Sequence, residues 1–192
     1  MRYYENTLRL RVDAKEKYRA HQLIDTLMQE RLQIKLPYSW RAIPFPGAEH
    51  YSAVQIRSSV ATGLPGEKAH EITFNNGDIM QFSCNLCSVI REYSYEGEKE
   101  RRIERTGNTE EVIAKLKRHA ARFGIDVLSC VEESEAMFHI KKPNKPVFKL
   151  GHKEMSVIAR VTDAGLVEQT IIEGMGNKRI FGFGYIWALE VL

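Results

Sequence analysis

The stretch VFKLGHKEMSVIARVTDAGLVEQTIIEGMGNKRIFGFGYIWALEV (residues 147–191) contains the patterns of a strand, a helix, a glycine-rich turn and a last strand. Residues 147–161 predict the first strand, and residues 164–173 predict a helix that ends at Gly174. Residues 180–191 predict the last strand. Upstream patterns predict a strand, a helix and two strands, at about 82–92, 110–123, 125–131 and 136–141. Strand, helix, strand, strand, helix, strand is the order of a ferredoxin-like domain.

The first half of the chain fits the same plan loosely. Residues 3–12 alternate apolar and polar side chains, as a half-buried strand does, and Asp13 is a candidate cap for a helix over residues 14–33. Two strand pairs follow, over 39–45 and 51–60 around Pro46-Gly47, and over 70–75 and 79–92 around Asn76-Gly77. The second helix of the plan is weak or missing.

We therefore predict an α+β protein built from two tandem ferredoxin-like (RRM-like) domains. We expect the N-terminal domain over residues 1–92 and the C-terminal domain over residues 93–192. Residues 93–108 are polar and highly charged with few apolar anchors, which is typical of a boundary or a loop.

The composition is that of an ordinary globular protein, with 43% hydrophobic and 28% charged residues in a chain of 192. No apolar run approaches the roughly 20 residues needed to span a bilayer, and the first residues lack the apolar core of a signal peptide. We therefore expect a cytoplasmic protein. The net charge of +3 is too small to indicate a partner, so affinity for nucleic acid depends on where basic side chains gather.

Three cysteines, an odd number, argue against a disulfide framework. Cys84 and Cys87 form a CxxC pair, but a structural zinc site usually needs four ligands and there is no second pair. Their surroundings are rich in strand-forming residues, so we expect both cysteines in a strand. No cluster of metal-binding carboxylates stands out, and we expect neither a metal nor a cofactor.

Tyr18 and His21 are candidates for acid–base chemistry. They are three residues apart on the predicted helix and lie away from its apolar stripe of Ala20, Leu23, Ile24 and Leu27. An imidazole that titrates near neutral pH beside a phenol suits proton transfer. On these residues alone, a surface pair without a function is the more common case.

Basic residues gather in four places. A glycine-rich segment can bring backbone amides and cations close to a phosphate; it contains Gly174, Gly176, Lys178, Arg179, Gly182 and Gly184. One face of the helix at 110–123 carries Lys115, Arg118, His119 and Arg122. A first basic loop carries Arg101, Arg102 and Arg105. A second basic loop carries Lys141, Lys142, Lys145, Lys149 and Lys153. Each set could contact an RNA backbone. For the glycine-rich segment this reading is favoured over a packing turn, and for the helix face it is balanced by a solvated surface. For any single lysine of the loops, a solubilising turn is the more common case.

Taken together, these segments resemble the CasE branch of the Cas-six superfamily of CRISPR endoribonucleases. The resemblance rests on the helix with Tyr18-x-x-His21-Gln22, the strand and helix around Ser156–Thr162 and 164–173, and the two Gly-hydrophobic-Gly pairs of the C-terminal segment. The last pair departs from the pattern, since Phe183 stands where many CasE proteins have a cysteine.

The resemblance implies a tandem ferredoxin-like fold and cleavage of precursor CRISPR RNA at the base of the repeat hairpin. It implies attack by the 2′-hydroxyl, products with a 2′,3′-cyclic phosphate and a 5′-hydroxyl, and no need for a metal. His21 matches the family's catalytic histidine, and Tyr18 matches a tyrosine that organises the site. Lys153 or Arg179 is the candidate cation at the phosphate. The implied partners are the CRISPR repeat RNA stem-loop and other subunits of a Cascade-type complex.

Two other functions stay open at this point. The chain could be a non-catalytic subunit that holds an RNA hairpin without cutting it. It could also be a ferredoxin-like module that has nothing to do with RNA, although the basic helix face and the Lys178-Arg179 pair argue against this.

Overall fold

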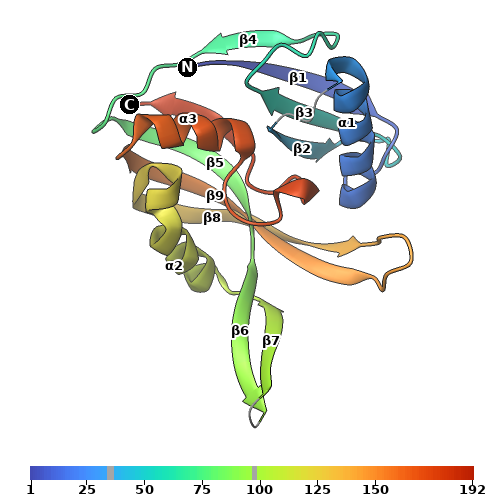
Figure 1. Ribbon diagram of the computed structural model, residues 1–192, viewed down its shortest axis with the longest axis vertical. Coiled ribbons are helices and arrows are strands. Elements are labelled where there is room, and N and C mark those ends of the chain that lie inside the picture. Colours follow the sequence, from blue (N-terminus) through green and yellow to red (C-terminus); the bar gives the residue numbers. More distant parts are fainter. Residues whose placement is uncertain (34–36, 97–98) are drawn as a thin grey trace.

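The computed structural model describes residues 1–33, 37–96 and 99–192, and the first sheet forms near the N-terminus (Figure 1). This sheet is antiparallel, with the order β2-β3-β1-β4, and helix α1 (Lys17–Leu32) packs beside it. Its strands are β1 (Arg2–Leu10), β2 (Tyr38–Pro44), β3 (Ser52–Ser58) and β4 (Lys68–Glu71). Residues 59–67 contain a bend and a turn but no helix, so the second helix of the plan is missing here.

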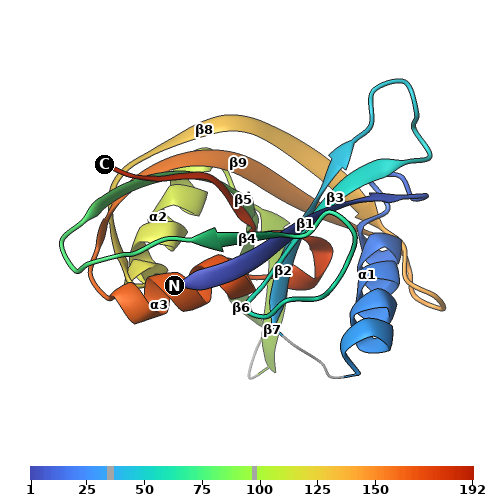
Figure 2. The same ribbon diagram turned by 90° about the horizontal axis from the view of Figure 1, so that it is seen from above.

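The second sheet has the order β10-β5-β9-β8, and α2 (Thr109–His119) and α3 (Ala164–Glu173) pack on one face of it (Figure 2). Its strands are β5 (Ile79–Cys87), β8 (Ile125–Ile140), β9 (Phe148–Val161) and β10 (Ile186–Val191). If the four strands of each half are numbered along the chain, both sheets read 4-1-3-2. The prediction of two tandem ferredoxin-like units is confirmed.

The predicted hairpin around Asn76-Gly77 is wrong. Strand β4 pairs with β1, whereas β5 pairs with β9 and β10, so the two strands belong to different sheets. The turn itself forms, and the Gly77 amide donates to the Val161 carbonyl at 2.8 Å. The chain thus changes sheets between Glu71 and Ile79, ahead of the division that we expected at residues 92 and 93.

The charged stretch that we expected to be a loop is a hairpin of β6 (Val89–Glu96) and β7 (Lys99–Thr106), which projects from the rest of the chain (Figure 1). The strand predicted over 79–92 is accordingly split between β5 and β6. The hairpin is stabilised by cross-strand charge pairs rather than by alternating apolar residues. Arg91 Nε bonds Glu104 at 2.9 Å, and Arg105 pairs with Glu92 across the same two strands.

The two strands predicted over 125–131 and 136–141 are one strand, β8, with two bulges. Leu128 and Glu133 have no partner in β9, and regular pairing resumes after each of them. Strand β5 pairs with β9 only from His152 to Arg160, so the β8–β9 ribbon extends beyond the sheet. Figures 1 and 2 show that its turn lies next to α1.

Helix α1 differs in detail from its prediction. It begins at Lys17, and Asp13 accepts a hydrogen bond from the Lys15 amide instead of capping the helix. Its buried face consists of Lys17, Ala20, Ile24 and Met28, whereas Leu23 is 42% exposed. The predicted strand over 180–191 begins only at Ile186, because Arg179–Phe181 form a short 3-10 helix, η2. Asn108 caps α2 through a reciprocal capping box with Glu111.

A buried ionic cluster connects the two halves of the molecule. Arg57 of β3 is 3% exposed, and its Nη2 bonds Glu5 of β1 at 2.9 Å. The same carboxylate accepts a hydrogen bond of 2.6 Å from Tyr185, which directly precedes β10. Arg57 Nη1 also donates to the carbonyl of Ile171 in α3 at 3.4 Å. The first sheet is therefore held against both the last helix and the last strand.

Among the described helices, none is long and apolar enough to cross a membrane.

Candidate active site

His21 lies in a pocket where the two halves of the chain meet. In Figure 1 the segment that follows α3 runs toward α1, and η2 contacts α1. The pocket, of about 290 Å³, is lined by His21, Asp25, Pro37, Tyr38, Trp40, Glu173, Arg179 and Ile180. We call it the His21 pocket. It places the predicted imidazole beside the predicted cation of the glycine-rich segment, although 158 positions separate the two residues (179 − 21).

The phenol nearest to His21 within this pocket is Tyr38, which sequence reasoning missed. The Tyr38 hydroxyl lies 3.4 Å from His21 Nδ1 and donates to Asp25 Oδ1 at 3.5 Å. Burial, and then the charge of Asp25, raise the pKa of Tyr38 above its ordinary value, so the hydroxyl stays protonated. Asp25, Tyr38 and His21 thus form a row that restrains the imidazole from one side.

Tyr18 lies in a different pocket. This lysine pocket, of about 630 Å³, is formed by the start of α1 and the β8–β9 turn, and includes Lys17, Tyr18, Lys141, Lys142 and Lys145. The Lys142 ammonium lies 5.3 Å from the centre of the Tyr18 ring, which is a cation–π distance. Tyr18 therefore contacts the lysine turn, and Tyr38 is the phenol whose contact with the imidazole is described.

Most glycines of the C-terminal segment serve packing. Their amides are already used, since Gly174 donates to Thr170, Gly182 to Arg179 and Gly184 to Asn85. A side chain at Gly184 would place its Cβ 1.9 Å from the Met175 carbonyl, and one at Gly182 would meet the Trp40 ring at 3.0 Å. Gly176 alone of the four predicted glycines is exposed. The predicted grip of phosphate by backbone amides is therefore wrong for the other three.

The two basic residues of this segment differ in their surroundings. Arg179 is exposed, and its Nη1 bonds Glu173 at 3.0 Å while the residue lines the His21 pocket. Lys178 has a left-handed backbone with φ of 64°, and its ammonium lies 4.0 Å from Glu104 of β7. Arg179 is thus the candidate cation for a phosphate at His21.

Lys153 is not a surface cation. Its side chain is 4% exposed, and its ammonium bonds Glu132 at 2.9 Å and Glu135 at 2.6 Å. These two carboxylates neutralise the charge within the protein and raise the pKa of Lys153. The prediction that Lys153 contacts RNA or the scissile phosphate is therefore wrong, whereas Lys141, Lys145 and Lys149 are exposed.

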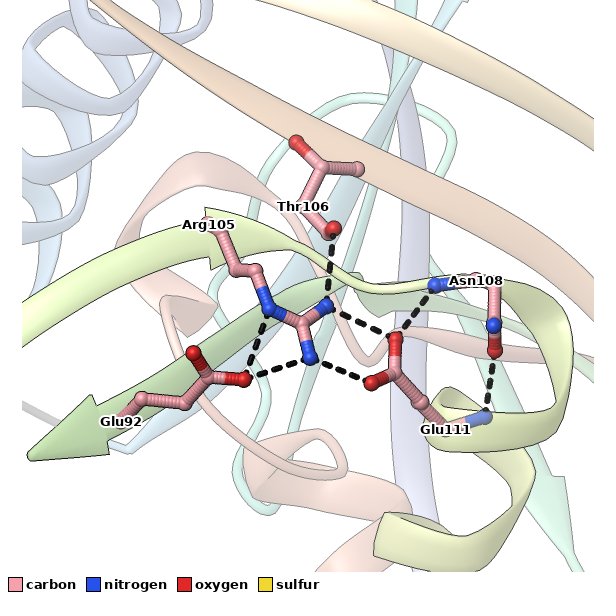
Figure 3. A network of polar contacts seen from close by, with 5 residues as sticks. All are labelled: Glu92, Arg105, Thr106, Asn108 and Glu111. Atoms are coloured by element: carbon pink, nitrogen blue, oxygen red, sulfur yellow. Dashed lines mark hydrogen bonds and ion pairs between the residues drawn. The ribbon is translucent and has the colours of Figure 1, made fainter.

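Arg105 is held at the base of the β6–β7 hairpin (Figure 3). Its guanidinium bonds Glu92 of β6 and Glu111 in the first turn of α2, with Nη1 to Glu111 Oε2 at 2.9 Å. These hydrogen bonds raise the pKa of Arg105 and lower that of Glu111 to about 2. Arg105 therefore fixes the hairpin relative to α2 instead of presenting a free cation. The side chains of Arg101 and Arg102 lie outside the described part of the structure.

The basic face of α2 forms as predicted, but its members are not equivalent. Lys115 is half-buried and donates to the Val89 carbonyl at 2.8 Å, and burial lowers the pKa of its ammonium. Arg118 and Arg122 are exposed. Lys115 therefore joins α2 to the hairpin, while the two arginines face solvent.

Cys84 and Cys87 are buried in β5, as the strand prediction required. Burial raises the pKa of both thiols, which keeps them protonated at neutral pH. Among the described residues, no three His, Cys, Asp or Glu side chains are grouped as metal ligands would be.

Two buried titratable side chains lie where α1 meets the β8–β9 ribbon. His152 is 7% exposed and contacts the rings of Phe138 and Phe183. Burial, and then the charge of Lys17, lower the pKa of His152 to about 4, and Glu154 opposes them more weakly. Lys17 is 3% exposed, its ammonium lies 4.7 Å from the Phe138 ring centre, and burial lowers its pKa to about 8.

The free energy of unfolding is expected to fall by about 2 kcal/mol between pH 6.5 and 4.5 because of His152 alone. The folded pKa lies below the ordinary value, so in this window only the unfolded chain takes up the proton, which favours unfolding. Urea unfolding at pH 6.5 and pH 4.5 gives the change in unfolding free energy between the two pH values, for the wild type and for His152→Leu. The wild type should lose about 2 kcal/mol more than the variant. An equal loss in the two proteins would contradict the lowered pKa of His152.

The fold and the pocket define a tandem ferredoxin-like protein with a histidine–arginine pocket between its halves. The family model described as CRISPR associated protein matches residues 5–187, and the chain belongs to this family. Among curated proteins, none matches in sequence.

Solved structures agree with the family. Cas6e from Escherichia coli K-12 is similar at 17% identity with a TM-score of 0.72, and all of both chains is covered. Cse3 from Thermus thermophilus, bound to an RNA representing a pre-cleavage complex, is similar at 16% identity with a TM-score of 0.70, also over both whole chains. A chain of a CRISPR RNA-guided surveillance complex is similar at 14% identity with a TM-score of 0.64, over 99% of this chain and all of that one. The resemblance to CasE proteins is confirmed at the level of family and fold.

Proposed function

We propose that this chain is an endoribonuclease that cuts precursor CRISPR RNA at the base of the repeat hairpin and remains bound to the hairpin product. The observation that carries the proposal is the His21 pocket, where an imidazole restrained by Tyr38 shares a surface with Arg179. The similar chains named as CRISPR endoribonucleases support it.

The proposed chemistry needs one proton-transfer group and one cation. The 2′-hydroxyl attacks the adjacent phosphorus, the bond to the 5′-oxygen breaks, and a 2′,3′-cyclic phosphate and a 5′-hydroxyl result. His21 takes the proton of the attacking hydroxyl or gives one to the leaving oxygen. The Arg179 guanidinium stabilises the negative charge that builds up on the phosphoryl oxygens. No step in this scheme calls for a metal ion.

Binding of the hairpin is assigned to the basic surfaces outside the pocket. A-form RNA is recognised mainly through its shape and backbone, which suits the exposed Lys141, Lys145 and Lys149 of the ribbon and Arg118 of α2. We extend the proposal to a Cascade-type complex as partner, because a chain of a surveillance complex has the same fold.

A hairpin-binding subunit that does not cut is the second candidate. One observation favours it: Glu173 lies 3.0 Å from Arg179 and offsets the only cation that the described part of the chain brings into the His21 pocket. For the first candidate to hold, the phosphate must take over this guanidinium, at least in part.

Cleavage of a labelled repeat RNA is expected to continue in excess EDTA, because the proposed chemistry uses only protein groups. Gel analysis should show one cut beside the hairpin, and phosphatase treatment after mild acid should reveal the cyclic phosphate. Tight binding without a cut would favour the second candidate. If no hairpin RNA binds, neither candidate stands.

A further inference from the structure

A second pocket shares Arg179 with the His21 pocket. It has about 480 Å³, within the range of about 300 to 1,000 Å³ that is usual for ligand sites, and it opens between α2, α3 and the glycine-rich segment. We call it the α2–α3 pocket. Its walls come from the second half of the chain, and His21 does not line it.

The inner wall of this pocket suits the flat face of a nucleobase. Leu86, Leu116 and Met175 are buried there, and Phe123 is half-buried among them. Gln169 and Asn177 are exposed and line the pocket. The Gln169 amide nitrogen donates to Glu173 at 2.8 Å, so its carbonyl and the Asn177 amide are the groups that can bond base edges. An apolar wall with a few polar groups around it is the usual plan of a small-ligand site.

The rim of the pocket carries an excess of positive charge. Four cations line it: Arg91, Lys115, Arg122 and Arg179. Arg91 is paired with Glu104, and Arg179 with Glu173, the one acid among the described lining residues, so Lys115 and Arg122 supply the excess. No carboxylate in the described residues forms an ion pair with Lys115, His119 or Arg122. Desolvation, followed by the charges of Arg122, Arg118 and Lys115, lowers the pKa of His119. An anion at this rim would be stabilised.

The α2–α3 pocket adjoins the proposed cleavage site. Glu173 and Arg179 line both pockets, so they form the wall that the two share. An RNA strand whose scissile phosphate lies at His21 and Arg179 can therefore place a neighbouring nucleotide on the other side of this wall. An unpaired nucleotide enters such a pocket without the cost of breaking a base pair.

We propose that the α2–α3 pocket receives one unpaired nucleotide next to the cleavage site, with the base against Leu116 and Met175 and its phosphate at Lys115 and Arg122. This inference rests on the proposed function and adds a specificity site to it. The enzyme then reads a single-stranded base as well as the hairpin. A free mononucleotide has the same chemistry, so the test separates the two sources.

The test replaces each unpaired nucleotide flanking the cut, one at a time, with an abasic residue. At one of these positions, the abasic RNA is expected to be cut with a kcat/KM roughly tenfold below that of the intact RNA, because its base is no longer buried against apolar side chains. Gln169→Trp, which covers the mouth from an exposed position, should cause a similar loss with the intact RNA. The abasic RNA and this variant combined should lose no more than either alone.

A matched pair of charge variants tests the phosphate contact. Arg122→Gln should weaken RNA binding and lower the salt slope of log K by about one unit. Lys117→Gln removes an exposed cation of α2 that does not line the pocket, and should leave both quantities unchanged. Equal effects of the two variants would overturn the contact.

The outcomes distinguish this inference from the proposed function. If the wild type cuts the hairpin RNA but no abasic position and no Gln169→Trp effect is found, the pocket assignment is wrong while the nuclease stands. In that case, an NMR titration of His119 with and without adenosine 5′-monophosphate shows whether the pocket binds a free nucleotide instead, since the bound phosphate would raise the pKa of His119. If no RNA is cut or bound, the proposed function itself fails.

Discussion

His21→Ala is expected to lower the single-turnover cleavage rate of repeat RNA by roughly 100- to 10,000-fold, the usual contribution of a placed proton-transfer group. Affinity for the uncut hairpin should stay within about twofold, because the exposed lysines and arginines that bind the backbone are untouched. His21 is only half-buried, so the truncation leaves the core of α1, at Ala20 and Ile24, in place. Rapid quench with excess enzyme measures the rate, and filter binding to a 2′-deoxy substrate measures the affinity.

His50→Ala is the matched control, because His50 is exposed and lies outside the His21 pocket. It should cut at the wild-type rate. A His21→Ala variant that cuts within about fivefold of the wild type would remove the imidazole from the mechanism. If this variant loses binding and cleavage together, His21 would instead be a binding residue.

Arg57→Met is expected to lower the free energy of unfolding by about 3 kcal/mol or more, because it removes one partner of a buried ion pair. Burial alone would raise the pKa of Glu5; hydrogen bonds from Tyr185 and Arg57 outweigh it and hold that pKa below its usual value. Without the guanidinium, this carboxylate stays in a poorly solvated place. The midpoint and slope of urea unfolding at pH 7 measure the change.

The double variant Arg57→Met/Glu5→Gln separates charge from packing. It removes the stranded carboxylate while an amide oxygen remains for the Tyr185 hydroxyl, so about 1 kcal/mol or more should be recovered. No recovery would place the loss in the ring contacts of Arg57 with Tyr3 and Tyr185 and in its bond to Ile171. A single variant within about 0.5 kcal/mol of the wild type would contradict the prediction.

The parts of the fold that were predictable are those whose cause is local. The Pro46-Gly47 turn and the end of α3 at Gly174 are each decided by neighbouring residues, and both form as expected. The Asn76-Gly77 turn is also local, but which strands it joins depends on pairing far along the chain, and so the hairpin prediction failed. The β6–β7 hairpin was predicted as a boundary or a loop because it has few alternating apolar side chains. Cross-strand charge pairs such as Arg91–Glu104 stabilise it instead.

The candidate site was predictable only as separate pieces. His21 and Arg179 each stood out by residue type, but their shared pocket depends on how the two sheets dock, which no local pattern contains. Tyr38 gave no signal, because a tyrosine at the start of a strand is ordinary. Lys153 looked like a surface cation because its partners, Glu132 and Glu135, lie on the neighbouring strand and not beside it in the sequence.

The bulges of β8 determine where evolution can add or remove a residue of this strand without a shift in register. Leu128 and Glu133 oppose no residue of β9, so a deletion at either position leaves every later pair in step. A deletion elsewhere in the strand would move Phe138 and Ile140 to the opposite face and take Ile140 out of the core. Natural insertions and deletions of single residues should therefore collect at these two points, because they leave the turn that carries the lysines in its place against α1.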